Sequence, residues 1–260
     1  MRNLRYLYFI SLAFAFSSCI SLQDTVYFQE NEFTQNSSTI IENEYPIYHL
    51  QKGDILSVKI KSLEVDNAEF LNIEPRNGFI NVNPGALFLN GYSVSENGAI
   101  HLPLIGSVIV EGLSLDEARI QIQRLVDEFF TDATAIINLV SFKVSVLGEV
   151  NRPGDYYVYN NRLTLLEAIS LAGDLRDFAD RTEITLLRQR EDGSEATILD
   201  ITDPNVISSP YFYLRPNDVV YVRPLKQKVK RSNLSTLTIV SAVVAVISTG
   251  ISIYALTQNN

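Results

Sequence analysis

The last part of the chain places the strongest constraint on its fold. From Leu234 to Leu256 the sequence runs for 23 residues without a charged side chain, and none follows before Asn260. A helix of that length, at about 1.5 Å per residue, is roughly 35 Å long and can cross a bilayer hydrocarbon core of about 30 Å. No later element follows that could bury its far side. The sequence therefore predicts a transmembrane helix at 234–256 with a tail at 257–260; a buried core helix is the alternative.

Small and hydroxylic residues recur along one side of this predicted helix. They are spaced 3, 4, 3 and 4 residues apart, and we call them the small-residue seam: Thr238, Ser241, Ala245, Ser248 and Ser252. Small residues let transmembrane helices approach closely, and their hydroxyls can bond across an interface or face water. The seam predicts several copies of the helix side by side, as a pore wall or an oligomer contact. A plain membrane anchor with incidental serines is the alternative.

The N-terminus has the features of a secretory signal. Arg2 and Arg5 precede an apolar run that ends at Phe16, and small residues lead into Cys19. The sequence Phe16-Ser17-Ser18-Cys19 resembles a lipoprotein processing site, which implies a signal peptide at 1–18 and a lipid on the Cys19 thiol. Cys19 is the only cysteine, so it has no partner for an internal disulfide. An uncleaved signal anchor is the alternative.

A basic linker at 225–233 precedes the predicted helix. It contains Lys226, Lys228, Lys230 and Arg231. In an inner-membrane protein such a cluster marks the cytoplasmic side, whereas the signal has already exported the chain. Both observations agree if the helix enters the outer membrane from the periplasm. We therefore expect a lipid-anchored protein in the outer membrane of a Gram-negative bacterium, with periplasmic domains.

Charge and composition exclude several classes of function. Removal of Arg2 and Arg5 with the signal leaves 19 basic residues against 30 acidic ones, a net charge of −11. Such a chain offers no general attraction to nucleic acid. His49 and His101 are the only histidines, and no pattern of nucleophile and base or of paired acids stands out. We expect no metal, no cofactor and no catalytic residue, and hence no enzyme.

The region between signal and linker divides into a tether and two domains. Residues 19–40 are polar and predict an acylated tether. The first domain, 41–143, contains a strand at 55–60 and a helix. This helix begins at a capping box formed by Ser114 and Glu117. The expected apolar face of this helix consists of Leu115, Ala118, Ile122, Leu125 and Phe129.

The second domain, 144–224, contains some of the same local sequence motifs as the first. Strands at 144–150 and 155–159 flank a turn, and a capping box of Thr164 and Glu167 begins a helix that runs to Ala172. Further strands are predicted at 184–189 and 196–201, and 214–222 closes the domain. Two internal similarities link the domains: 113–118 matches 163–168, and 50–58 matches 214–222, with Asn217 in the place of Gly53.

The motifs at these positions resemble a known family. Tyr48, Leu50, Gly53 and Asp54, followed by Leu102, Pro103 and Gly106, resemble the export domain of Wza-type outer-membrane polysaccharide exporters. Gly148, Pro153 and Gly154, with the helix that follows, resemble the SLBB module of that family. The resemblance implies an α+β fold with a β-rich export domain, a β-grasp-like SLBB domain and one C-terminal transmembrane α-helix.

The resemblance also implies a function. The expected assembly is a homo-oligomeric ring whose helices form a pore in the outer-membrane lipid, with capsular or extracellular polysaccharide as the transported substrate. The implied partner is an inner-membrane chain-length and export kinase complex. Among the tyrosines near 156–159 and 211–213, Tyr157 is a candidate sugar contact, and aromatic filling of the strand core is the alternative. The alternative function is a periplasmic lipoprotein that binds glycan or a partner without forming a conduit.

Overall fold

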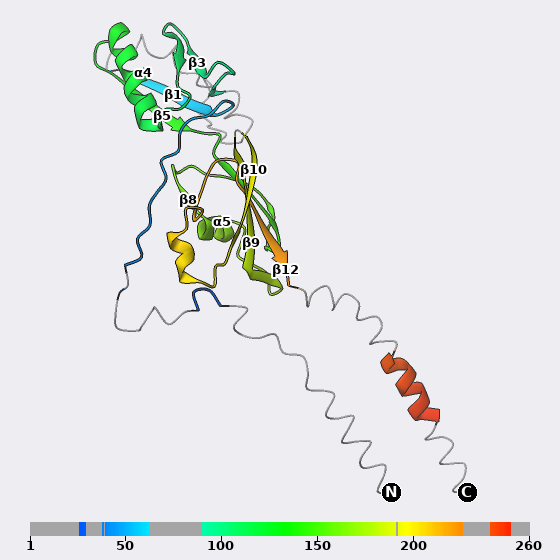
Figure 1. Ribbon diagram of the computed structural model, residues 1–260. Coiled ribbons are helices and arrows are strands. Elements are labelled where there is room, and N and C mark those ends of the chain that lie inside the picture. The colour runs from blue at the N-terminus through cyan, green and yellow to red at the C-terminus, as the bar shows by residue number, and fades with distance from the viewer. Residues whose placement is uncertain are drawn as a thin grey trace, which may run out of the picture.

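The computed structural model describes residues 26–29, 38, 40–62, 90–190, 192–225 and 240–250. Within these ranges two folded units follow one another along the chain (Figure 1). Each unit combines β-sheet with one α-helix and has a hydrophobic core of its own. The predicted combination of β-rich domains with helices is therefore confirmed for this part of the chain.

The first unit is built on a three-stranded antiparallel sheet. Its strand order is β2 (Tyr92–Ser93), β1 (Ile55–Ser62) and β5 (Ala133–Leu139). A separate hairpin joins β3 (Ala99–Leu102) to β4 (Gly106–Ile109). Burial alternates along β5, as it does in a strand with one face toward a core.

Helix α4 (Leu115–Phe129) covers the core face of this sheet. The predicted capping box is present, because Ser114 accepts from the Glu117 N–H and the Glu117 carboxylate accepts from the Ser114 N–H. Its buried residues are Ala118, Ile122 and Val126. The prediction that Phe129 belongs to this face was wrong, since its side chain is 55% exposed. The core ends at this last turn, and the next residue, Phe130, packs against it instead.

One side chain of α4 occupies the outer edge of β5. The Gln123 side-chain amide donates to the Ala133 carbonyl at 2.8 Å and accepts from the Ala135 N–H at 2.7 Å. It thereby takes the place that a neighbouring strand would have at this point. An edge occupied in this way is not open to unwanted strand pairing there.

The second unit contains a five-stranded sheet in the order β10-β9-β12-β6-β7. The strands are β6 (Lys143–Gly148), β7 (Gly154–Tyr157), β9 (Ala179–Arg190), β10 (Gly193–Leu199) and β12 (Val219–Pro224). Strand β12 runs parallel to β6 and antiparallel to β9. A small second sheet joins β8 (Leu163–Thr164) to β11 (Tyr213–Leu214), and a 3₁₀ helix spans Pro204–Ser208.

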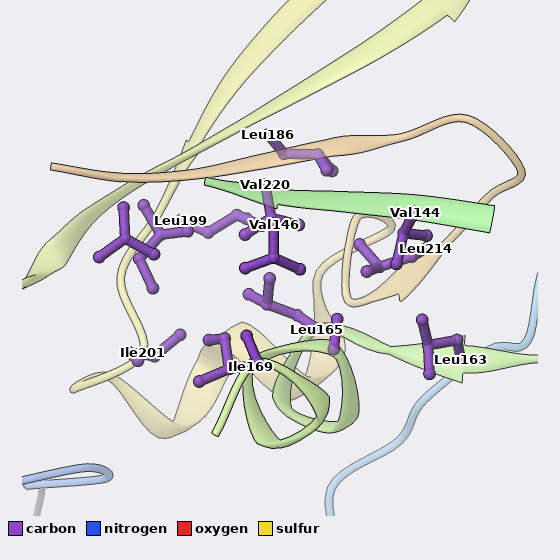
Figure 2. Packing of buried hydrophobic residues seen from close by; sticks show 14 of the residues in the cluster. Val144, Val146, Leu163, Leu165, Ile169, Leu186, Leu199, Ile201, Leu214 and Val220 are labelled. Carbon is purple, nitrogen blue, oxygen red and sulfur yellow. The ribbon is translucent and has the colours of Figure 1, made fainter. Parts of the chain in front are cut away.

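Helix α5 (Leu165–Leu171) packs on one face of this sheet. Figure 2 shows Val146 and Val220 of the sheet pointing toward Leu165 on the helix, with Ile169 and Leu186 beside them. All five side chains are at most 3% exposed. Thr164 and Glu167 form the predicted capping box. The helix thus begins where the sequence indicated, and its buried face closes the second core.

Residues 26–29 lie against the second unit. The N–H groups of Phe28 and Gln29 donate to the carbonyls of Ile201 and Thr202 at 3.3 and 2.7 Å. Tyr27 and Phe28 also pack against the second core. The sequence predicted only a polar tether at 19–40 and did not indicate this contact. Tyr27 and Phe28 are two aromatic residues within that polar stretch, and both pack against the second core.

The described part of the C-terminal helix is residues 240–250, which are helical. Residues 234–239 and 251–256 of the predicted span lie outside the described residues. No helix among the described residues is both long enough and apolar enough to cross a membrane.

Candidate functional site

Two buried aspartates stand at the entrances to β1 and β12. Asp54 accepts from the N–H of Gln51 at 2.9 Å and donates its own N–H to the Gln51 carbonyl at 3.1 Å. Asp218 makes the same pair of bonds with Arg215, at 2.7 and 3.1 Å. The two carboxylates therefore close equivalent turns, one in each domain.

The residues around these turns also correspond. Gly53 and Asn217, which precede the aspartates, both have positive φ, +83° and +66°. Glycine and asparagine are the residues that adopt this conformation at least cost. Leu50 and Leu214 are both buried and lie beside the residues that cap α4 and α5. The similarity of 50–58 to 214–222 is thus confirmed as a repeated local structure.

Asp54 ties the connection between β5 and β6 to the first domain through its remaining hydrogen bonds. It accepts from the Tyr48 hydroxyl at 2.8 Å and from the Ser141 hydroxyl at 3.2 Å. Ser141 belongs to the connection between β5 and β6, and its hydroxyl accepts from the Ile55 N–H at 3.1 Å. Burial raises the pKa of Asp54, although the hydrogen bonds from Gln51, Tyr48 and Ser141 act in the opposite direction.

Asp218 has a charged partner in place of a tyrosine. Arg188 donates from Nε and Nη2 to the two carboxylate oxygens at 3.0 and 2.8 Å, and both side chains are almost fully buried. Nη2 also donates to the Tyr213 carbonyl at 3.1 Å. The guanidinium lies over the ring of Tyr211, 5.3 Å from its centroid, and the Tyr211 hydroxyl donates to Glu195. This buried ion pair, with its hydrogen bonds made, holds the turn before β12 against β9 at the end of the second core.

The motif at 102–106 forms the turn of the β3–β4 hairpin. Leu102 is 2% exposed and pairs with Gly106, which has a φ of +88° that suits glycine. Pro103 lies between them, and its carbonyl accepts from the Ile105 N–H. Leu104 at the tip has a φ of +64° and is 59% exposed, although it is large and apolar.

The SLBB motif forms a turn that caps the C-terminal end of α5. The Asn151 side chain donates to the Gly173 carbonyl at 2.7 Å, and the Arg152 N–H donates to the Ala172 carbonyl at 2.8 Å. Carbonyls at a helix end lack partners within the helix, so these donors satisfy them. Pro153 and Gly154 then lead the chain into β7.

Gly148 ends β6 at the start of this turn, where only glycine fits. Its φ is +92°, and a Cβ there would lie 2.0 Å from the carbonyl oxygen of Val222 on the parallel strand β12. No side chain can occupy that space unless the strands move apart. The glycine of the motif is therefore required by the close approach of two backbones.

The aromatic residues considered for sugar contact have separate surroundings. Tyr157 is half-buried on β7, opposite Lys143. The Tyr156 hydroxyl donates to the Arg152 carbonyl, Phe212 belongs to the core, and Tyr213 lies edge-on to Tyr45, with 5.1 Å between ring centroids. These partners account for most of the aromatic residues as packing groups, and Tyr157 remains a candidate sugar contact.

The remaining predicted residues belong to the two ends of the chain. Cys19, Thr238 and Ser252 lie outside the described residues. Ser241, Ala245 and Ser248 are exposed on the helix at 240–250. In the part of the chain that the structure describes, no group of three or more histidine, cysteine, aspartate or glutamate side chains could hold a metal ion. The motif residues hold turns, a helix end and the domain junction together.

Each of the two domains matches a known family. Residues 42–140 match the family described as polysaccharide biosynthesis/export protein, and residues 142–222 match the SLBB domain. The chain thus contains both domains of the polysaccharide export family, which confirms the resemblance inferred from the motifs. This family is one of export proteins and not of enzymes.

Three curated relatives support this assignment. The chain is 32% identical over 108 residues to the EPS I polysaccharide export outer membrane protein EpsA of Ralstonia nicotianae, which covers 40% of this chain and 28% of that protein. It is 28% identical over 140 residues to EpsA of Ralstonia solanacearum, covering 52% and 36%. It is 32% identical over 89 residues to the exopolysaccharide production protein ExoF of Rhizobium meliloti, covering 33% and 21%. The matched regions thus span only 21–36% of the length of these relatives.

Proposed function

We propose that this protein is the outer-membrane subunit of a translocon that exports capsular or extracellular polysaccharide. The observation that carries the proposal is the order of an export domain and an SLBB domain within one chain. The names of the Ralstonia relatives place polysaccharide export in the outer membrane. The signal sequence and Cys19 supply a route to that location, with a lipid anchor and periplasmic domains.

The C-terminal run at 234–256 is proposed to cross the outer membrane as a helix. Its sequence has the required length without charge. In the described part, Ser248 and Thr249 donate their hydroxyls to the Ala245 carbonyl at 2.9 and 2.7 Å. Hydroxyls bonded in this way cost less to place in lipid, because their polar groups are satisfied within the helix.

Several copies of the chain are proposed to form a ring whose helices surround a pore. The small-residue seam supports close packing of neighbouring helices, while Val243, Val244 and Ile247 on the same helix are exposed apolar side chains. Polysaccharide would pass through the ring, and an inner-membrane chain-length and export kinase complex would deliver it. No covalent chemistry is required of this chain.

Bulky substitutions in the seam test the pore. Ser241→Phe and Ala245→Phe should abolish surface polysaccharide and disrupt the oligomer in mild detergent, because they separate neighbouring helices. Val243→Phe, which adds similar bulk away from the seam, is the matched control and should retain both. Normal export by all three variants would refute the seam as a subunit contact and favour a lipoprotein that binds glycan or a partner without forming a conduit.

A further inference from the structure

Both ends of the folded body meet at one segment of the second domain, residues 174–181. On the N-terminal side, the Tyr27 hydroxyl donates to the carboxylate of Asp174, and the Tyr27 ring lies over Arg181, 5.6 Å from the guanidinium carbon. On the C-terminal side, the Leu225 N–H donates to the Phe178 carbonyl at 2.8 Å. We call residues 174–181 the convergence segment. Figure 1 shows residues 26–29 and the end of β12 at the same end of the second unit, opposite the first unit.

The contact made by residues 26–29 has a defined geometry. Besides the two backbone hydrogen bonds to Ile201 and Thr202, the Gln29 side chain donates to the Val26 carbonyl at 2.7 Å and fixes the local turn. Arg181 is only 8% exposed, so the ring of Tyr27 compensates part of the cost of burying its charge. Burial and the hydrogen bond to Asp174 raise the pKa of Tyr27, so its hydroxyl stays protonated further above neutral pH than that of an exposed tyrosine.

Chain length places both proposed membrane attachments close to the convergence segment. Six residues separate Cys19 from Val26, and the seven residue-to-residue steps between them span at most roughly 25 Å when fully extended. Eight residues separate Leu225 from Leu234, a reach of roughly 30 Å. Four of those eight are basic and would meet the anionic headgroups of a lipid surface. Two attachments on one face restrain the tilt of a body as well as its distance from the membrane.

We propose that the convergence segment is the surface of the folded body that faces the lipid bilayer, and that Tyr27 clamps the lipid-bearing leash to it. The inference rests on the proposed lipid attachment at Cys19 and on the proposed C-terminal helix. Without the clamp, the leash would begin near Glu42, whose carbonyl accepts from the Ser208 hydroxyl, and the body could turn about it. With the clamp, only six residues remain between the lipid-bearing cysteine and the body.

The test uses the full-length protein in nanodiscs of phosphatidylethanolamine and phosphatidylglycerol that contain a headgroup nitroxide quencher. A fluorophore is attached through Asp177→Cys in the convergence segment or through Arg124→Cys in α4, both of which are exposed positions. The probe at 177 should be quenched severalfold more than the probe at 124. Equal quenching at the two positions would overturn the claim that this segment faces the membrane.

Variants of Tyr27 test the clamp itself. Tyr27→Ala should accelerate hydrogen exchange of the Phe28 and Gln29 amides at least tenfold and reduce quenching at 177. Tyr27→Phe keeps the ring over Arg181, loses the bond to Asp174, and should fall between wild type and alanine. Tyr159→Ala, at a tyrosine that is 73% exposed in the same domain, is the control and should change neither readout. Unchanged exchange in Tyr27→Ala would overturn the clamp.

The mass of the wild-type protein separates failure of this inference from failure of the proposed function. An unmodified Cys19 would refute the proposed lipid attachment and, with it, the clamp's role on a lipid leash. Quenching at residue 177 then decides by itself whether the convergence segment faces the membrane. A lipidated Cys19 with equal quenching at 177 and 124 would refute the inference and leave the proposed export function standing.

Discussion

Replacement of Gly148 by alanine should weaken the second domain more than any other single-methyl addition to its motif. The φ of +92° costs an alanine about 1–2 kcal/mol. The added methyl would lie 2.0 Å from the Val222 carbonyl oxygen, a backbone atom that accepts from the Glu149 N–H, and relief of such overpacking costs about 1–3 kcal/mol. Alanine also lowers the conformational entropy of the unfolded chain relative to glycine, and this offsets about 0.4–1 kcal/mol of the destabilisation. The expected net destabilisation is about 2–4 kcal/mol.

Hydrogen exchange of the β6 and β12 amides in the full-length protein measures this loss, because the slowest amides report opening of the whole domain. Gly154→Ala is the matched control, since that glycine has no positive φ and its Cβ would meet no atom within 4 Å. The control should change the opening free energy by less than about 1 kcal/mol. A loss below about 1 kcal/mol in Gly148→Ala, or an equal loss in the control, would refute the close-approach explanation.

Three further predictions concern the turns and the ion pair. Arg188→Ala leaves Asp218 buried without its partner and should cost about 3–5 kcal/mol in urea unfolding; a loss under about 1 kcal/mol would show that the pair is not needed. Leu104→Gly relieves a left-handed residue with a largely exposed side chain and should stabilise the first domain by up to about 1 kcal/mol in the same assay, whereas a clear loss would mean that Leu104 packs against something. Because burial raises the pKa of Asp54 above its ordinary 3.8, the folded state binds more protons than the unfolded state just above that pH, so the stability contributed by this group falls as pH rises through the window between the two pKa values. Asp54→Asn should remove this dependence, and identical slopes of unfolding free energy against pH for both proteins would contradict the assignment.

Local features of the fold could be predicted from the sequence because their causes are local. Ser114 and Glu117, and likewise Thr164 and Glu167, form their capping boxes within four residues of chain. The turn around Gly53 could be predicted because glycine stands beside Asp54, just before a run of alternating apolar and polar residues. These patterns needed no knowledge of the partner elements.

Contacts between distant residues could not be predicted, since no pattern in one stretch specifies its partner. The parallel pairing of β12 with β6 joins segments more than 70 residues apart, for example Val220 with Val146. Asp218 has the sequence context of a turn residue, and only the fold shows that Arg188 on β9 is its partner. The docking of Tyr27 depends in the same way on Asp174 and Arg181, which the fold brings to one place.

The mass and shape of the full-length protein in mild detergent test the central proposal most directly. A closed ring of several subunits that loses its narrow membrane-facing end when residues 234–260 are deleted is the result that a polysaccharide translocon with a helical pore predicts. A stable monomer of unchanged shape after the deletion would contradict the ring and the pore.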